Sequence, residues 1–92
     1  MNKNILVLPG DGIGQEVTAS ATKVLEFLIE KYSLDFSVTS MDVGGTAYDQ
    51  YGSPLPGEVL NSAKEADAIL FGAVGGPKWD NLDWDVRPEN AL

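Results

Sequence analysis

The stretch Ile5–Gly14 reads ILVLPGDGIG and joins an apolar run to a glycine-rich turn. Ile5–Leu8 is continuously apolar and stops at Pro9, which is typical of a central parallel strand that is covered on both faces. The glycines that follow favour a tight turn, because glycine adopts backbone angles that other residues avoid. This stretch therefore predicts a strand that turns directly into a helix, the first unit of an α/β fold.

The next two elements follow from hydrophobic periodicity. Apolar residues recur at steps of three and four and predict one helix with a single apolar stripe: Val17, Ala21, Val24, Leu25, Leu28 and Tyr32. Leu34, Phe36 and Val38 then alternate with polar residues, and this period of two predicts a second strand with one more exposed face.

The rest of the chain repeats the pattern after a long connection. Residues 43–56 are rich in turn formers and predict a loop, with a helical turn at residues 46–50. Pro56 can open a second helix, and the apolar run Asp67–Val74 predicts a third strand. The order β-α-β-loop-α-β predicts a doubly wound α/β architecture with a mostly parallel sheet and flanking helices. A sheet of three strands covers itself poorly, so we expect an incomplete first domain.

Composition narrows the classes of function. The 92 residues carry a formal net charge of −8 and only 6 basic residues, which argues against binding to nucleic acid or to an anionic membrane. The absence of Cys and His excludes disulfides, thiolate chemistry and an imidazole base. The amino terminus shows no secretory pattern, and no apolar run approaches bilayer length, so we expect a cytoplasmic protein.

The turn Gly10–Gly14 stands where a Rossmann fold would hold a pyrophosphate, between a strand and a helix. Its spacing differs from the dinucleotide fingerprint, because Gln15 occupies the position of the third glycine, three residues after Gly12, and no acidic residue ends the second strand. The alternative is a tight connection in which the glycines permit close packing and Asp11 caps the helix that follows.

A second candidate loop follows the third strand. Gly75 and Gly76 allow a backbone or a ligand to approach closely, and Pro77 fixes a backbone angle. Ligands of open α/β sheets collect beyond the carboxyl ends of the strands, where Lys78 and Trp79 would lie. The alternative is an ordinary exit from a strand, with Trp79 covering the core.

Taken together, several motifs resemble those of a known enzyme family. They are Leu8–Gly14 (LPGDGIG), Asp42–Gly45 (DVGG), Gly52–Pro56 (GSPLP) and Phe71–Trp79 (FGAVGGPKW), followed by Arg87–Glu89 (RPE). In order and spacing they resemble the amino-terminal part of the isopropylmalate dehydrogenases. That group belongs to the metal-dependent decarboxylating dehydrogenases of β-substituted malates, with isocitrate and tartrate relatives.

This resemblance implies NAD-dependent oxidative decarboxylation of 3-isopropylmalate to 4-methyl-2-oxopentanoate in leucine biosynthesis. Mg²⁺ or Mn²⁺ would act as a Lewis acid, and a nicotinamide would carry the hydride. It also implies a homodimer in which both subunits contribute to the site. Residues 1–92 would be the amino-terminal part of the first, cofactor-binding domain, with the rest of the enzyme absent and this part alone inactive.

The resemblance also assigns residues. Glu89 would lie between the nicotinamide and the side chain of the substrate, and Leu92 would begin the apolar substrate pocket. No catalytic or metal-binding residue of the family falls within this sequence. The segment that corresponds to the NAD-contacting loop consists of Gly76, Pro77, Lys78, Trp79, Asp80, Asn81, Leu82, Asp83, Trp84, Asp85, Val86, Arg87, Pro88 and Glu89.

Some residues have a simpler structural interpretation, and two positions depart from the family pattern. Trp79 is expected to pack and order the loop, and Lys78, Asp49 and Asp80 to be solvated or capping. Gln15 replaces the usual proline at the helix start, and residues 83–85 are unusually acidic and aromatic.

Other functions stay open on the sequence alone. The chain could belong to a related isocitrate, homoisocitrate or tartrate dehydrogenase. It could also be a free-standing α/β module that binds a nucleotide or anion without catalysis, or a structural remnant with no ligand.

Overall fold

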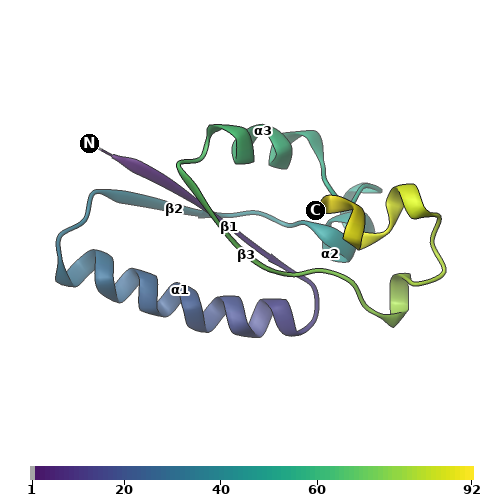
Figure 1. The fold of residues 1–92 in the computed structure, drawn as a ribbon, viewed down its shortest axis with the longest axis horizontal. Coiled ribbons are helices and arrows are strands. Elements are labelled where there is room, and N and C mark those ends of the chain that lie inside the picture. The colour runs from purple at the N-terminus through teal and green to yellow at the C-terminus, as the bar shows by residue number, and fades with distance from the viewer. Residues whose placement is uncertain (1) are drawn as a thin grey trace.

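The computed structural model describes residues 2–92 and has a parallel three-stranded sheet at its centre (Figure 1). Strand β1 (Lys3–Gly10) lies between β2 (Phe36–Ser40) and β3 (Ala68–Ala73), and both neighbours run parallel to it. Ile5 pairs with Val38 on one side and with Ala68 on the other. The sequence predicted these three strands, and the apolar run of β1 is explained by its central place.

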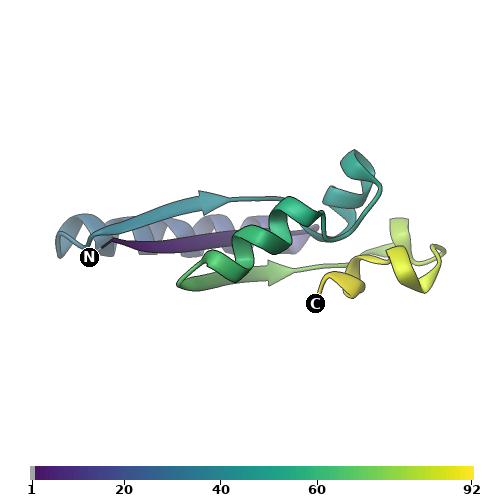
Figure 2. The same ribbon diagram turned by 90° about the horizontal axis from the view of Figure 1, so that it is seen from above.

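Helices cover both faces of the sheet, as predicted for a doubly wound fold (Figures 1 and 2). Helix α1 (Ile13–Lys31) covers one face and α3 (Gly57–Glu65) covers the other. Helix α2 (Gly44–Tyr51) lies beyond the carboxyl ends of the strands and is longer than the single turn that the sequence suggested. Short 3₁₀ turns η1 (Pro77–Trp79), η2 (Trp84–Val86) and η3 (Pro88–Ala91) complete the chain.

The buried core lies between the sheet and α3. Leu6 and Leu8 project from β1 and pack with Val43 and with Val59 of α3. Val43 is fully buried directly before α2, so the core fixes the place where that helix begins.

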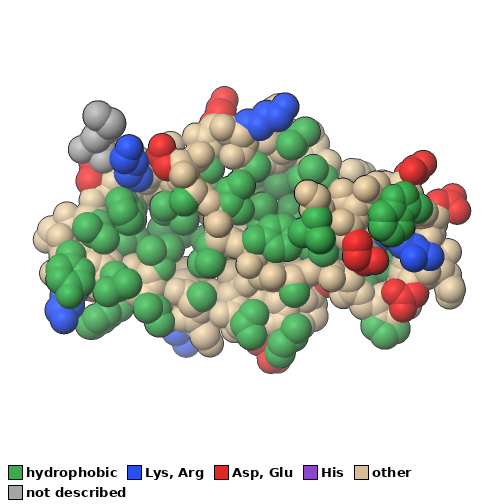
Figure 3. All heavy atoms as spheres, viewed as in Figure 1, with side chains coloured by type: hydrophobic (Ala, Val, Ile, Leu, Met, Phe, Trp, Pro, Cys, Tyr) green, Lys and Arg blue, Asp and Glu red, His purple; other side chains and the backbone are tan. Residues whose placement is uncertain are grey.

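The apolar stripe predicted on α1 is buried only in part, since Ala21 and Leu25 are half-buried and its other members are exposed. Val17 and Val24 are 52% and 59% exposed, whereas Gly14 and Thr18 are the buried residues of the helix. Small residues are needed there because the helix lies very close to β3: a side chain at Gly72 would stand 2.4 Å from Thr18 Oγ1 and 2.2 Å from the Pro9 carbonyl oxygen. Figure 3 shows hydrophobic side chains exposed over the α1 part of this view.

Candidate functional site

The carboxyl ends of the three strands lead into three segments on one side of the molecule (Figure 2). We call these segments, Asp11–Gly12, Met41–Val43 and Val74–Gly76, the carboxyl edge. Ligands of open α/β sheets gather at this edge. The Gly76–Leu92 segment, which contains every residue assigned to a site by the sequence, starts from it.

Asp11 is the central polar residue of the carboxyl edge. Its side chain is 2% exposed, and each oxygen accepts two hydrogen bonds. The Thr46 amide and hydroxyl donate to Oδ1 at 2.8 and 2.9 Å. The Gly45 and Gly75 amides donate to Oδ2 at 2.7 and 2.9 Å. This buried carboxylate is therefore stabilised by donors from two other segments, which offsets the cost of removing it from water.

Asp11 does not cap the helix that follows it, contrary to the expectation from the sequence. Helix α1 has no side-chain cap, and its first bonds are made by the Gly14 and Gln15 amides to backbone carbonyls. The Asp11 side chain instead binds two amides in the first turn of α2, whose own N-cap residue, Val43, cannot accept a side-chain hydrogen bond.

Trp79 packs against α2, in agreement with its expected structural role. A side-chain carbon at Gly45 would stand 2.1 Å from the Trp79 ring, so the ring rests directly on the helix backbone. The indole Nε1 donates to Asp49 Oδ1 at 3.2 Å, and Lys78 Nζ lies 2.7 Å from Asp49 Oδ2. Lys78 and Asp49 are therefore paired with each other, while their side chains stay 67% and 38% exposed to solvent.

The hydrogen bonds to Asp49 also lower the pKa of its carboxyl group. The hydrogen bond from Lys78, followed by that from Trp79, holds the pKa of the Asp49 carboxyl below its ordinary value, because both favour the charged form. Asp49 therefore stays ionised into the acid range and keeps η1 attached to α2.

Side-chain to backbone hydrogen bonds order the end of the Gly76–Leu92 segment. Arg87 Nε donates to the Leu82 carbonyl at 2.9 Å, and Asn90 Nδ2 donates to the Asp85 carbonyl at 2.8 Å. Pro88 is fully buried, so the turn that carries Glu89 is fixed to the core.

Glu89 returns to the carboxyl edge. A side-chain carbon at Gly75 would stand 2.9 Å from Glu89 Oε1, so the carboxylate lies against this glycine. Glu89 is partly exposed, and no residue among 2–92 donates a hydrogen bond to its side chain. A carboxylate in this position is available to a ligand.

The other residues that the sequence assigned to the site do not come together at the carboxyl edge. Trp84 is 63% exposed and Leu92 is 85% exposed. Asp80, Asn81, Asp83 and Asp85 are also exposed. Residues 2–92 thus bring Trp79 and Glu89 to the carboxyl edge but do not close an apolar pocket around Leu92.

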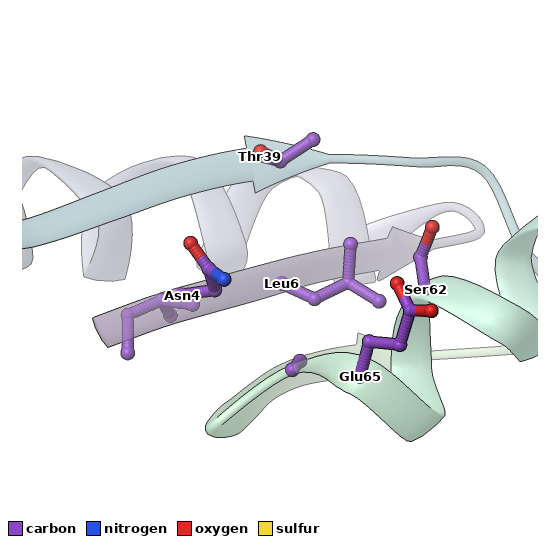
Figure 4. Close-up of a pocket in the computed structure, with 7 residues that line it drawn as sticks. Asn4, Leu6, Thr39, Ser62 and Glu65 are labelled. Carbon is purple, nitrogen blue, oxygen red and sulfur yellow. The ribbon is translucent and has the colours of Figure 1, made fainter. Parts of the chain in front are cut away.

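Two hollows in the surface lie apart from these residues. One, of about 160 Å³, is lined by Asn4, Leu6, Thr39, Ser62 and Glu65, beneath α3 and over the middle of β1 (Figure 4). Another, of about 460 Å³, lies near the end of β2 and the start of α3. Neither is lined by the Gly76–Leu92 segment, so neither supports the assigned site.

Sequence reasoning missed the role of Asp11 and Thr46 as the pair that connects the edge. One signal was present: the sequence Val43-Gly44-Gly45 before a helical turn offers no side-chain cap of its own.

None of the helices within residues 2–92 is both long and apolar enough to span a bilayer.

The family follows from comparison with known proteins. The family model described as isocitrate/isopropylmalate dehydrogenase matches residues 4–92. The chain belongs to the isocitrate/isopropylmalate dehydrogenase family. Across all 92 residues it is 56% identical to the 3-isopropylmalate dehydrogenase of Pseudomonas fluorescens (strain Pf0-1) and 59% identical to that of Hydrogenovibrio crunogenus. In both cases the chain covers 26% of the relative, about a quarter of its length.

Solved structures of this dehydrogenase family share the fold. A β-decarboxylating dehydrogenase from Thermococcus kodakarensis, in its apo form, matches with a TM-score of 0.65 and 32% identity, over 82% of this chain and 21% of that one. The isocitrate dehydrogenase of Methylococcus capsulatus matches with a TM-score of 0.61 and 29% identity, over 86% and 23%. The α/β fold predicted from the sequence is confirmed.

Proposed function

We propose that this chain is the amino-terminal quarter of a 3-isopropylmalate dehydrogenase. The complete enzyme would oxidise 3-isopropylmalate with NAD and decarboxylate it to 4-methyl-2-oxopentanoate, in leucine biosynthesis. The observation that carries the proposal is the identity of 54–59% along the whole chain to relatives with that name. The match to the isocitrate dehydrogenase structure is weaker, at 29% identity.

The described residues fit the nicotinamide end of NAD better than its pyrophosphate. Asp80, Asp83 and Asp85 are exposed in the Gly76–Leu92 segment and would repel phosphate groups. Glu89 offers an unpartnered carboxylate at Gly75, which suits a cationic ring and the hydroxyls of a ribose. When bound, NAD supplies the hydride acceptor. In the proposal, this chain's residues orient that end of the cofactor.

The described residues alone do not fit a divalent metal ion. Among residues 2–92, no group of three or more Asp, Glu, His or Cys side chains could hold one. In the proposal, the Mg²⁺ or Mn²⁺ ligands and the groups that move protons belong to the rest of the enzyme.

Leu92 is the proposed first residue of the pocket for the isopropyl group. Its side chain is 85% exposed within residues 2–92, so an apolar partner could cover it. A pocket of this kind separates alkyl substrates by roughly 1 to 3 kcal/mol per methylene. Glu89 and Leu92 lie on the same turn, η3, or at its end, which places the charged and apolar contacts side by side.

The exposed surface of α1 disfavours the alternative of a free-standing nucleotide-binding module. Ile13, Val17, Val24 and Phe27 are all more than half exposed, which is unusual for a small soluble domain. A longer chain with further elements would cover this surface.

We also propose that the complete enzyme is a homodimer in the cytoplasm.

The test is a substrate panel with the full-length protein. NADH formation is measured with 3-isopropylmalate, isocitrate, homoisocitrate and tartrate, each with Mg²⁺ or Mn²⁺ and with NAD or NADP. We expect the highest kcat/KM for 3-isopropylmalate with NAD, and loss of turnover on chelation of the metal. A higher kcat/KM for isocitrate, homoisocitrate or tartrate would assign the chain to that branch instead.

A further inference from the structure

We propose that Asp11 is a positioning residue that sets the places of Glu89 and Trp79 at the carboxyl edge. This inference rests on the proposed function for its effect on turnover, but its structural part does not. The starting observation is that Asp11 is buried, and that its four donors come from two segments distant in sequence, Gly45–Thr46 and Gly75.

The two donors on Oδ2 connect Asp11 to the candidate site. They are the amides of Gly45 and Gly75. Gly45 is the residue on which the Trp79 ring rests, and Gly75 is the residue against which the Glu89 carboxylate lies. One oxygen therefore fixes the two backbone positions that support both side chains.

The carboxylate fits its place closely. A side-chain carbon on Gly44 would stand 2.6 Å from Asp11 Oδ2, and the positive φ of Gly44, 74°, is one that favours glycine. The backbone amide of Asp11 also donates to the Ala73 carbonyl at 2.7 Å, just before the segment that leads to Gly75. Both the backbone and the side chain of Asp11 thus hold the exit of β3.

Four donors demand four acceptor sites, which only a carboxylate provides here. In Asp11→Asn, one oxygen becomes an NH₂ group that would face N–H or O–H donors. Either the amides of Gly45 and Gly75 or the amide of Thr46 would lose their acceptor, whichever way the side chain turns; the Thr46 hydroxyl can still donate to the Gly10 carbonyl, at 3.2 Å. The substitution keeps the shape and removes the bonds on one oxygen, either those from Gly45 and Gly75 or those from Thr46.

Thr46 allows a gentler test of the same contact. Thr46→Val keeps the branched shape and removes the hydroxyl, which can donate to Asp11 Oδ1 and to the Gly10 carbonyl, whereas Thr46→Ser keeps this hydroxyl. Asp42→Asn is a matched control, because Asp42 is also at the carboxyl edge but accepts only a side-chain bond from Gln50, at 2.9 Å.

The first measurement is hydrogen exchange by mass spectrometry on the full-length protein. We expect amides in residues 43–49 and 75–90 to exchange about tenfold faster or more in Asp11→Asn, while those of α1 and β2 keep their rates. Thr46→Val should show a smaller change in the same peptides, and Thr46→Ser and Asp42→Asn almost none. Unchanged exchange at 75–90 in Asp11→Asn would overturn the proposal.

The second measurement is a double-mutant cycle in kcat/KM with 3-isopropylmalate. We expect Asp11→Asn to lower kcat/KM by about tenfold or more, and the double variant Asp11→Asn/Glu89→Gln to be little worse than Glu89→Gln alone. Independent, multiplying losses would show a general structural role and would contradict positioning through Glu89.

Two further outcomes are also decisive. If Asp11→Asn does not fold, the Thr46 pair decides: faster exchange at residues 75–90 in Thr46→Val than in Thr46→Ser supports the proposal, and equal rates overturn it. If the parent protein does not turn over 3-isopropylmalate, the proposed function fails, and the exchange data still establish or refute the positioning role.

Discussion

The carboxyl edge and the outer face of α1 differ in how far their side chains find partners within residues 2–92. At the edge, hydrogen bonds within the chain join the segments that follow β1 and β3 to the start of α2, with Asp11 bound to four donors. On the outer face of α1, by contrast, the apolar side chains of Val17, Val24 and Phe27 are more than half exposed. The comparison indicates that these 92 residues organise their candidate site locally, whereas apolar side chains of α1 stay exposed within residues 2–92.

The largest effect is expected where β3 packs against α1. Gly72→Ala would place a carbon 2.2 Å from the Pro9 carbonyl oxygen and close to Thr18, so backbone must move. We expect a loss of about 3 kcal/mol in the free energy of unfolding, measured by denaturant titration of the full-length protein. Gly57→Ala is the control: nothing lies within 4 Å of its new carbon, and alanine favours a helix there. Equal stabilities of the two variants would show that α1 is not held this closely.

A charge on the outer face of α1 tests the other half of the comparison. Val24→Glu should cost about 2 kcal/mol or more in the full-length protein, because further polypeptide would bury the new carboxylate without a partner. In the 92-residue chain the same change should have little effect, since Val24 is 59% exposed.

Lys23→Glu is the matched control on the same helix, at an exposed charged position. It should change stability by less than about 0.5 kcal/mol in both proteins. If Val24→Glu is as harmless as Lys23→Glu in the full-length protein, the outer face is solvent-exposed there, and the contrast between the two regions fails.

A substitution at Glu89 tests function at the carboxyl edge without a large effect on folding. Glu89→Gln keeps the shape and removes the charge, and no residue among 2–92 loses a hydrogen bond to it. We expect kcat with 3-isopropylmalate to fall about tenfold, and thermal unfolding to change little. Parental turnover together with parental substrate affinity would remove Glu89 from the site.

The sequence predicted the elements of this molecule better than their contacts. The apolar run at Ile5–Leu8 and the alternation after Leu34 report local burial, so β1 and β2 could be recognised. The buried face of α1 could not, because its residues Gly14 and Thr18 are selected by the close approach of β3, which periodicity does not encode.

The candidate site was predictable only in part, for the same reason. The family resemblance identified Glu89 and Trp79, but the partner of Asp11 is a helix start more than thirty residues away. Local capping rules favoured the nearer helix, α1. Tertiary structure decided otherwise, since Gly44 and Gly45 leave room for the Asp11 carboxylate at the start of α2.

The smallest expected effect concerns the exposed pair that attaches η1 to α2. Lys78 and Asp49 side chains are 67% and 38% exposed, so solvent and salt screen their attraction. Lys78→Met should lower the melting temperature only slightly at low salt, and no more than the control Lys23→Met at high salt. A large loss at both salt concentrations would show that Lys78 has a structural role beyond this ion pair.

The contribution of the same contact to stability should also depend on pH. Because the pKa of Asp49 is lowered in the folded protein, its contribution to stability is complete above the ordinary carboxyl pKa and is lost as the pH falls through the folded value. Thermal unfolding of the parent and of Asp49→Asn should therefore differ at neutral pH and converge in acid. A difference that persists in acid would mean that Asp49 acts through packing rather than charge, and that the η1 contact resembles the buried edge more than an exposed ion pair.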